Sequence, residues 1–159
     1  MKKFAGRLAE AVGTGFYSGY FPIAPGTVGA AVGVAIYAVL VRLGVLSPSS
    51  LTGWLILVAV VLGMGWASAW HLEKRFGPDN RRIVIDEVWG MLLSVALLPA
   101  WPPGYVIGGF LLFRFFDIVK PFPARRAERV GRGLGVMLDD GIAGIYANVV
   151  LVLVRTLVG

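Results

Sequence analysis

Five apolar segments dominate the pattern of the chain, three of them long and two short. The long segments run from about Gly26 to Val41, from Leu51 to Trp70 and from Gly141 to Val158; the short ones cover Val88–Leu98 and Tyr105–Phe116. A transmembrane helix needs about 20 mostly apolar residues. The pattern therefore predicts an all-α, polytopic integral membrane bundle with three full spans and two shorter helices.

The stretch PAWPPG separates the two short segments and favours either a kink within one span or the tip of a helical hairpin. With a cytoplasmic N-terminus, the hairpin leaves only Arg42 and Arg155 of the 15 Lys and Arg residues outside, whereas a kinked span divides them 8 to 7. The positive-inside tendency favours the hairpin. Its cytoplasmic set is Lys2, Lys3, Arg7, Lys74, Arg75, Arg81, Arg82, Arg114, Lys120, Arg125, Arg126, Arg129 and Arg132.

The short arms leave one question open. Arms of about 12 helical residues reach only ~18 Å, less than the ~30 Å hydrocarbon core. Whether the two arms around Pro102 and Pro103 cross the bilayer is therefore undecided, although the hairpin begins and ends in the cytoplasm in either case.

Composition supports the membrane interpretation. Hydrophobic residues make up 57% of the 159 residues and charged residues only 15%, too few for the surface of a soluble domain of this length. We expect one membrane-embedded domain, residues 1–159. The net charge of +6 is best explained by topology or by anionic lipid rather than nucleic acid, and Arg125–Arg132 could concentrate such lipid. The absence of cysteine excludes thiolate chemistry.

Five acids fall at the cytoplasmic ends of the segments. Asp86 and Glu87 precede the third segment, Asp117 ends the fourth, and Asp139 and Asp140 precede the fifth. A single pair could simply cap a helix N-terminus. Two such pairs and a facing aspartate favour a divalent cation, and oxygen ligands without cysteine favour Mg²⁺. One member of each pair could bind the metal while the other orients it or acts as a base.

Basic and hydroxyl residues provide candidates for anion binding beside these acids. Arg114 and Lys120 flank Asp117 in the chain. A glycine-rich stretch, residues 13–30, carries Thr14 and places Thr27 near a predicted helix start, where free N–H groups can receive phosphate oxygens. An ordinary N-cap within a tight interfacial loop is the alternative.

Four motifs in this order resemble the phosphatidylglycerophosphatase A family: GTGFYSGYFPIAPGTVGA, IDEVWGMLL, FRFFDIVKPFP and GLGVMLDDGIAGIYA. The match extends from about Gly13 to Tyr146. The resemblance implies a largely helical, Mg²⁺-dependent lipid phosphatase of the bacterial cytoplasmic membrane. Its substrate would be phosphatidylglycerophosphate, made at the cytoplasmic leaflet, and its products phosphatidylglycerol and inorganic phosphate. Oligomeric state stays open.

On this hypothesis the acids hold one or two Mg²⁺ ions. Glu87, Asp139 and Asp140 are the first-choice ligands, with Asp86 and Asp117 as further ligands or as their supports. Metal-assisted attack by water is one route. Direct attack by a carboxylate, forming an aspartyl-phosphate, is the other.

Further roles fall to the neighbouring residues. Lys120, Arg114 and Thr27 would complete the phosphate pocket, with Thr14 as another candidate. Asp140 is the candidate proton acceptor, and Lys120 and Asp86 are the other candidate catalytic residues.

Three other functions compete. A phosphatase for another lipid phosphomonoester, such as phosphatidic acid, is the nearest. A small transporter would use the carboxylates as an ion path, but it would place them near the bilayer midplane, whereas here they lie at segment ends. A non-catalytic scaffold would leave the gathered acids unexplained.

Overall fold

The computed structural model describes residues 2–78, 80–98, 103–127, 130–131 and 133–158, without the side chains of Lys2 and Val158. Within these ranges the chain is helical and has no strand, which confirms the predicted all-α class. The elements are α1 (Lys2–Gly13), the 3₁₀ turn η1 (Ser18–Tyr20), α2 (Pro25–Arg42), α3 (Leu51–Phe76), α4 (Ile85–Ser94), α5 (Pro103–Val119), α6 (Ala124–Ala127) and α7 (Leu134–Val158).

Three helices, α2, α3 and α7, are long and apolar enough to cross a membrane, as predicted. Pro25 opens α2 at a position where a missing N–H has little cost. Ser50 caps α3 by accepting a hydrogen bond from the Gly53 N–H at 3.1 Å. The last helix differs from the prediction, because α7 begins at Leu134 rather than at Gly141.

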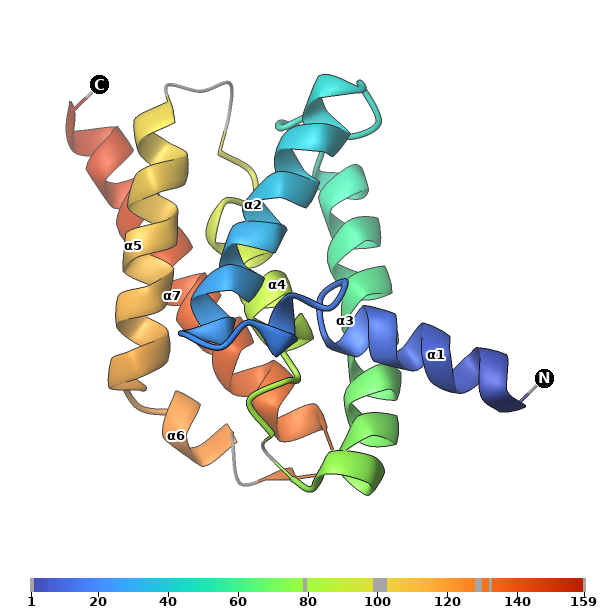
Figure 1. Cartoon of the computed structure of the whole chain (residues 1–159). Helices are drawn as coiled ribbons and strands as arrows, with labels where there is room; N and C mark the ends of the chain where they lie inside the picture. Colours follow the sequence, from blue (N-terminus) through green and yellow to red (C-terminus); the bar gives the residue numbers. More distant parts are fainter. Residues whose placement is uncertain (1, 79, 99–102, 128–129, 132, 159) are drawn as a thin grey trace.

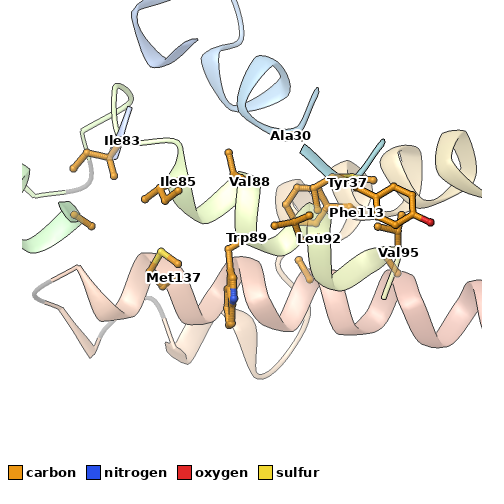
Figure 2. Packing of buried hydrophobic residues seen from close by; sticks show 14 of the residues in the cluster. Ala30, Tyr37, Ile83, Ile85, Val88, Trp89, Leu92, Val95, Phe113 and Met137 are labelled. Atoms are coloured by element: carbon orange, nitrogen blue, oxygen red, sulfur yellow. The ribbon is translucent and has the colours of Figure 1, made fainter. Parts of the chain in front are cut away.

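The short helix α4 lies at the centre of the bundle, where it packs mainly against α7 and α2 (Figure 1). Most of its side chains are buried. In Figure 2, Val88 and Trp89 leave opposite sides of α4, and Trp89 lies over α7. The Trp89 Nε1–H donates to the Val58 carbonyl of α3 at 2.9 Å. α4 is therefore held from several sides.

α4 and α5 run antiparallel and contact each other (Figure 1), as the hairpin predicts and a kinked span does not. Of the proposed tip, PAWPPG at residues 99–104, the first four residues lie outside the described residues, and Pro103 and Gly104 begin α5. The arms are less equal than predicted. α4 has 10 residues, whereas α5 has 17 and reaches ~26 Å.

The first helix was not predicted. α1 runs outward from the bundle, across the direction of α2 (Figure 1), and packs on α3. The Arg75 guanidinium of α3 and the Tyr20 hydroxyl both donate to the Glu10 carboxylate, at 2.7 and 2.5 Å. Together these two contacts lower the pKa of Glu10. They fix the end of α1 against the bundle.

Candidate active site

Two acids of the site come from the first turn of α4. Asp86 and Glu87 are its second and third residues, where they interact favourably with the helix dipole. The Val84 N–H donates to the Gly13 carbonyl at 3.0 Å, which ties the start of α4 to the end of α1. The helix dipole explains why acidic residues are favourable in this first turn. It does not explain why they lie beside another acid.

Asp86 and Glu87 converge on Asp140 of α7. Each of the three residues offers an oxygen within 4.8 Å of the other two. The Oδ1 of Asp86, the Oε2 of Glu87 and the Oδ2 of Asp140 are buried and have no hydrogen-bond partner within the part of the chain that the structure describes. Buried carboxylate oxygens are costly unless a cation compensates them. The acidic cluster, as we call Asp86, Glu87 and Asp140, therefore fits a divalent cation that accepts hard oxygen ligands.

The surroundings of the cluster also favour protonation when no cation is bound. Burial raises the pKa of Glu87 to about 7. Burial, with the neighbouring Glu87 carboxylate as the next cause, raises the pKa of Asp86 well above its ordinary value. A bound cation would reverse this preference, because it stabilises the charged carboxylates.

Asp139, a first-choice ligand from the sequence, is engaged differently. Its Oδ2 lies 2.6 Å from the Nζ of Lys120, and the Asp139 side chain is only 3% exposed. Lys120 directly follows α5 with a left-handed backbone, φ 48°. Asp139 and Asp140 are also not at a helix start, since α7 begins at Leu134 and both lie inside its second turn. Helix capping therefore does not explain this pair.

Asp117 has a basic partner of its own on α5. The Nη1 of Arg114 lies 2.5 Å from the Asp117 Oδ2, while the Nε of Arg114 is buried and without a partner. The Asp117 carboxyl is close enough to Glu87 and Asp140 to interact with both electrostatically. Arg114 and Asp117 thus line the acidic cluster on the α5 side.

The start of α2 covers the same place. A Cβ on Gly26 would collide with the Glu87 Oε1 and would lie 3.3 Å from the Arg114 Nη1. Only glycine allows α2 to begin so close to these side chains. Thr27 is the next residue, half-buried, and its N–H bonds to the Ala24 carbonyl at 3.0 Å. The prediction that Thr27 lies near a helix start is confirmed.

Thr14 has a structural role in the turn after α1. It is fully buried, and its hydroxyl donates to the Glu10 carbonyl at 2.6 Å while accepting from the Tyr17 N–H at 3.1 Å. The hydroxyl proton is therefore already used within the turn. The structure gives Thr14 no contact with the acidic cluster among the described residues.

Glycines, which the sequence arguments overlooked, allow α4 and α7 to meet. A Cβ on Gly144 would collide with the Gly90 carbonyl oxygen, and one on Gly90 would lie 2.7 Å from the Asp140 carbonyl oxygen. A Cβ on Gly141 would collide with the Trp89 ring. This close crossing brings Asp140 beside Asp86 and Glu87. The sequence did contain a sign of this close packing, because Gly141 and Gly144 follow the two aspartates.

A basic cavity of about 520 Å³ lies at the end of α5, lined by Lys120, Arg125 and Arg126 together with Val119, Pro121 and Phe122. The Tyr146 hydroxyl donates to the Phe122 carbonyl at 2.7 Å, which holds this turn against α7. Of the further basic residues predicted to attract anionic lipid, Arg129 and Arg132 lie outside the described residues.

Comparisons with known proteins agree on one family. The family model for phosphatidylglycerophosphatase A matches residues 11–155. The chain is 36% identical over 139 residues to a phosphatidylglycerophosphatase A of Haemophilus influenzae, covering 86% of this chain and 82% of the relative. It is 32% identical over 139 residues to the phosphatidylglycerophosphatase A of Escherichia coli, covering 86% of this chain and 77% of the relative.

A third relative has a different name. The chain is 41% identical over 154 residues to a protein of Bacteroides thetaiotaomicron that is provisionally named phosphatidylinositol-3-phosphatase, covering 93% of this chain and 94% of the relative. No solved structure matches the chain.

Proposed function

The chain belongs to the phosphatidylglycerophosphatase A family, and from that premise we propose that it hydrolyses phosphatidylglycerophosphate to phosphatidylglycerol and inorganic phosphate with the help of Mg²⁺. The family makes it a phosphatase, and three apolar helices make it a membrane protein. Its substrate would be a phospholipid that remains in the bilayer while its headgroup reaches the site.

The observation that carries the proposal is the acidic cluster itself. Three carboxylates lie together, and each has one buried oxygen that finds no hydrogen-bond donor among the described residues; the Nε of the neighbouring Arg114 likewise has no partner there. Such a site attracts a divalent cation on one side and a phosphate on the other. A phosphomonoester bound with a cation satisfies both sets of unpaired atoms.

We assign the cation to Asp86, Glu87 and Asp140, with Asp117 as a neighbouring support. Bound there, Mg²⁺ would neutralise phosphate oxygens and lower the pKa of an attacking water. The remaining chemistry belongs to the protein. Arg114, with a free Nε beside the cluster, would bind a phosphate oxygen of the substrate.

The start of α2 and the Lys120 pair would complete the pocket. Pro25 has no N–H, and the Thr27 and Val28 N–H groups donate to the Ala24 carbonyl. The Gly26 N–H beside Glu87 and the Thr27 hydroxyl are therefore the candidate donors to a phosphate oxygen at this helix start. Lys120 neutralises Asp139 and so limits negative charge where an anionic substrate must approach. Asp140 remains the candidate acceptor for the proton of the attacking water.

A second lipid deserves direct comparison. The relative of 41% identity is named for phosphatidylinositol 3-phosphate, which is also a membrane lipid with a terminal phosphomonoester. The same cluster could hydrolyse it without a change of mechanism. The two substrates differ in the alcohol that carries the phosphate, so headgroup contacts rather than the cluster would decide between them.

The test is phosphate release by the purified protein in detergent micelles. Substrates are phosphatidylglycerophosphate, phosphatidylinositol 3-phosphate and phosphatidic acid, each with Mg²⁺ and with chelator. We expect Mg²⁺-dependent release that is fastest from phosphatidylglycerophosphate and lost in Asp140→Asn. Glu73→Gln, an acid of α3 outside the cluster, is the control and should remain active. No release from any of the lipids by folded protein would refute the proposal.

We also propose that the protein resides in the bacterial cytoplasmic membrane with the cluster on the cytoplasmic side. The basic residues of α6 and of the α3–α4 connection support this orientation through the positive-inside tendency. Reporter fusions after Arg82 and after Arg126 should both report a cytoplasmic position. Opposite results for the two fusions would contradict it.

A further inference from the structure

Two apolar cavities lie between α2 and α5. The first, of about 240 Å³, is lined by Ala31, Val34, Val106, Ile107 and Phe110. The second, of about 350 Å³, is lined by Val34, Tyr37, Ala38, Val41, Arg42, Pro103 and Val106. Val34 and Val106 line both cavities, so the two lie next to each other along the same pair of helices. We call these residues together the α2–α5 groove.

One end of the groove lies at the candidate active site. α2 and α5 approach each other where Gly26 meets the Arg114 guanidinium beside Glu87. Residues three or four apart share a helix face. Thr27 therefore continues the α2 face of Ala31 and Val34, and Arg114 continues the α5 face of Phe110. A ligand lying in the groove would reach the cluster without crossing another helix.

The walls of the groove suit hydrocarbon. Apart from Tyr37 and Arg42 near its far end, the lining side chains are apolar. Ala31, Ala38 and Ile107 are exposed, so the groove is open toward the surroundings of the bundle, which in a membrane are lipid. α2 packs mainly on α4 and α5 mainly on α7, and α2 and α5 contact each other less closely, with the two cavities between them.

The length of the groove matches one lipid leaflet. Half of the hydrocarbon core is ~15 Å, equal to about ten helical residues. An acyl chain entering beside Thr27 would thus extend to about Tyr37, past the first cavity and into the second. A peptide would find few polar partners along these walls for its backbone groups, which are costly to leave unpaired.

We propose that the α2–α5 groove binds one acyl chain of the lipid substrate and thereby positions its headgroup at the acidic cluster. This inference rests on the proposed function for the identity of the headgroup. It adds the path by which the lipid enters, sideways from the bilayer between α2 and α5, and the residues that hold it.

Two matched variants test the groove. Ile107 of α5 and Leu55 of α3 have isomeric side chains and are 60% and 61% exposed, but only Ile107 lines the groove. Since both positions are exposed, tryptophan should leave folding intact at either one. Activity is measured on a long-chain and on a dihexanoyl substrate with the same headgroup.

We expect Ile107→Trp to lower kcat/KM for the long-chain lipid by about tenfold or more, because a displaced chain misplaces the reacting phosphate. Its activity on the dihexanoyl lipid should stay within about twofold of the wild type, and Leu55→Trp should change neither activity, since Leu55 lies on α3 outside the groove. Equal losses on both lipids, or no loss in Ile107→Trp, would overturn the groove as an acyl site.

A second measurement does not depend on turnover. Phosphatidic acid with a diazirine at mid-chain is photolysed with the wild-type protein in micelles, and the labelled residues are mapped. We expect labels at Ala31, Val34 and Val106 in excess over Leu55 of α3, which is 61% exposed and lines neither cavity of the groove. Labelling spread evenly over the apolar surface would overturn the proposal. If the protein hydrolysed none of the lipids but was labelled specifically in the groove, only the proposed function would be refuted.

Discussion

The acids near the site form two groups that differ in what neutralises them. Asp139 and Asp117 each contact a basic side chain of the protein, Lys120 and Arg114, at 2.6 and 2.5 Å. Among the described residues, the acidic cluster of Asp86, Glu87 and Asp140 has no such partner, and one oxygen of each is buried without a donor. From the sequence the division was drawn differently, with Glu87, Asp139 and Asp140 as first-choice ligands and Asp86 and Asp117 as further ligands or supports.

The difference separates residues that stabilise the fold from residues that need a ligand. A buried acid paired with a lysine or arginine contributes to folding as long as its partner remains. Buried acids grouped together repel one another, so they weaken the folded protein until a cation binds. Substitutions in the two groups should therefore have opposite effects on activity and stability.

Removing a cluster acid should have the largest effect on activity. We expect Asp140→Asn and Glu87→Gln each to lower kcat for lipid hydrolysis by at least about 100-fold, because the cation loses a ligand. The melting temperature of each variant in detergent without metal should equal or exceed that of the wild type, since one repelling charge is gone. Near-normal turnover in both variants would contradict the distinction between cation-binding acids and acids paired with a lysine or arginine.

The α4–α7 crossing supplies the next test, because it holds Asp140 against the acids of α4. Gly144→Ala should lower the free energy of unfolding by about 1–3 kcal/mol, since the added methyl meets the Gly90 carbonyl. Gly63→Ala on α3 is the matched control. Nothing lies within 4 Å of its added methyl, so it should raise stability by about 0.5–1 kcal/mol. Equal effects of the two variants would mean that the crossing is not tight.

Breaking the Lys120–Asp139 ion pair should lower stability, and a second substitution should compensate for the loss. Lys120→Met leaves the Asp139 carboxylate, 3% exposed, without this partner and should lower the free energy of unfolding by about 1–3 kcal/mol. Adding Asp139→Asn should recover much of that loss, as measured by chemical denaturation. A double variant no more stable than Lys120→Met would contradict the assignment of this pair as structural.

The last expected effect is a pH dependence specific to the cluster. Folding raises the pKa of Glu87 from 4.5 to about 7, so the folded protein keeps a proton that the unfolded chain releases. Without metal, stability should therefore fall as pH rises from about 4.5 to about 7 and level off above it. Excess Mg²⁺ should remove this fall. The melting temperature of Glu87→Gln should show a flatter profile, and an unchanged slope would exclude Glu87 as its source.

Much of this architecture could be predicted from local pattern. Apolar segments marked the three spans, and the distribution of basic residues favoured the hairpin that α4 and α5 form. The boundaries were less accurate. Polar residues hid the first turns of α7, so Asp139 and Asp140 were expected at a helix start instead of inside the helix. α1 was missed because its apolar residues alternate with charged ones in a short segment.

The division among the acids could not be read from the sequence. Adjacent residues on a helix diverge by about 100°, so Asp139 and Asp140 face different neighbours. Which one meets Lys120 depends on where α5 ends, and that is set by the left-handed residue Lys120 itself. The close approach of α2 and α7 to α4 depends on glycines whose importance appears only when the helices are packed.

Direct metal binding tests the central claim that the acidic cluster, rather than all five acids, receives the cation. Mn²⁺ binding to the purified protein in detergent is followed by electron paramagnetic resonance for the wild type, Asp140→Asn and Asp139→Asn. We expect Asp140→Asn to lower the affinity by about 100-fold and Asp139→Asn to remain within about fivefold of the wild type. Equal binding by Asp140→Asn and the wild type, or a greater loss in Asp139→Asn, would contradict the account.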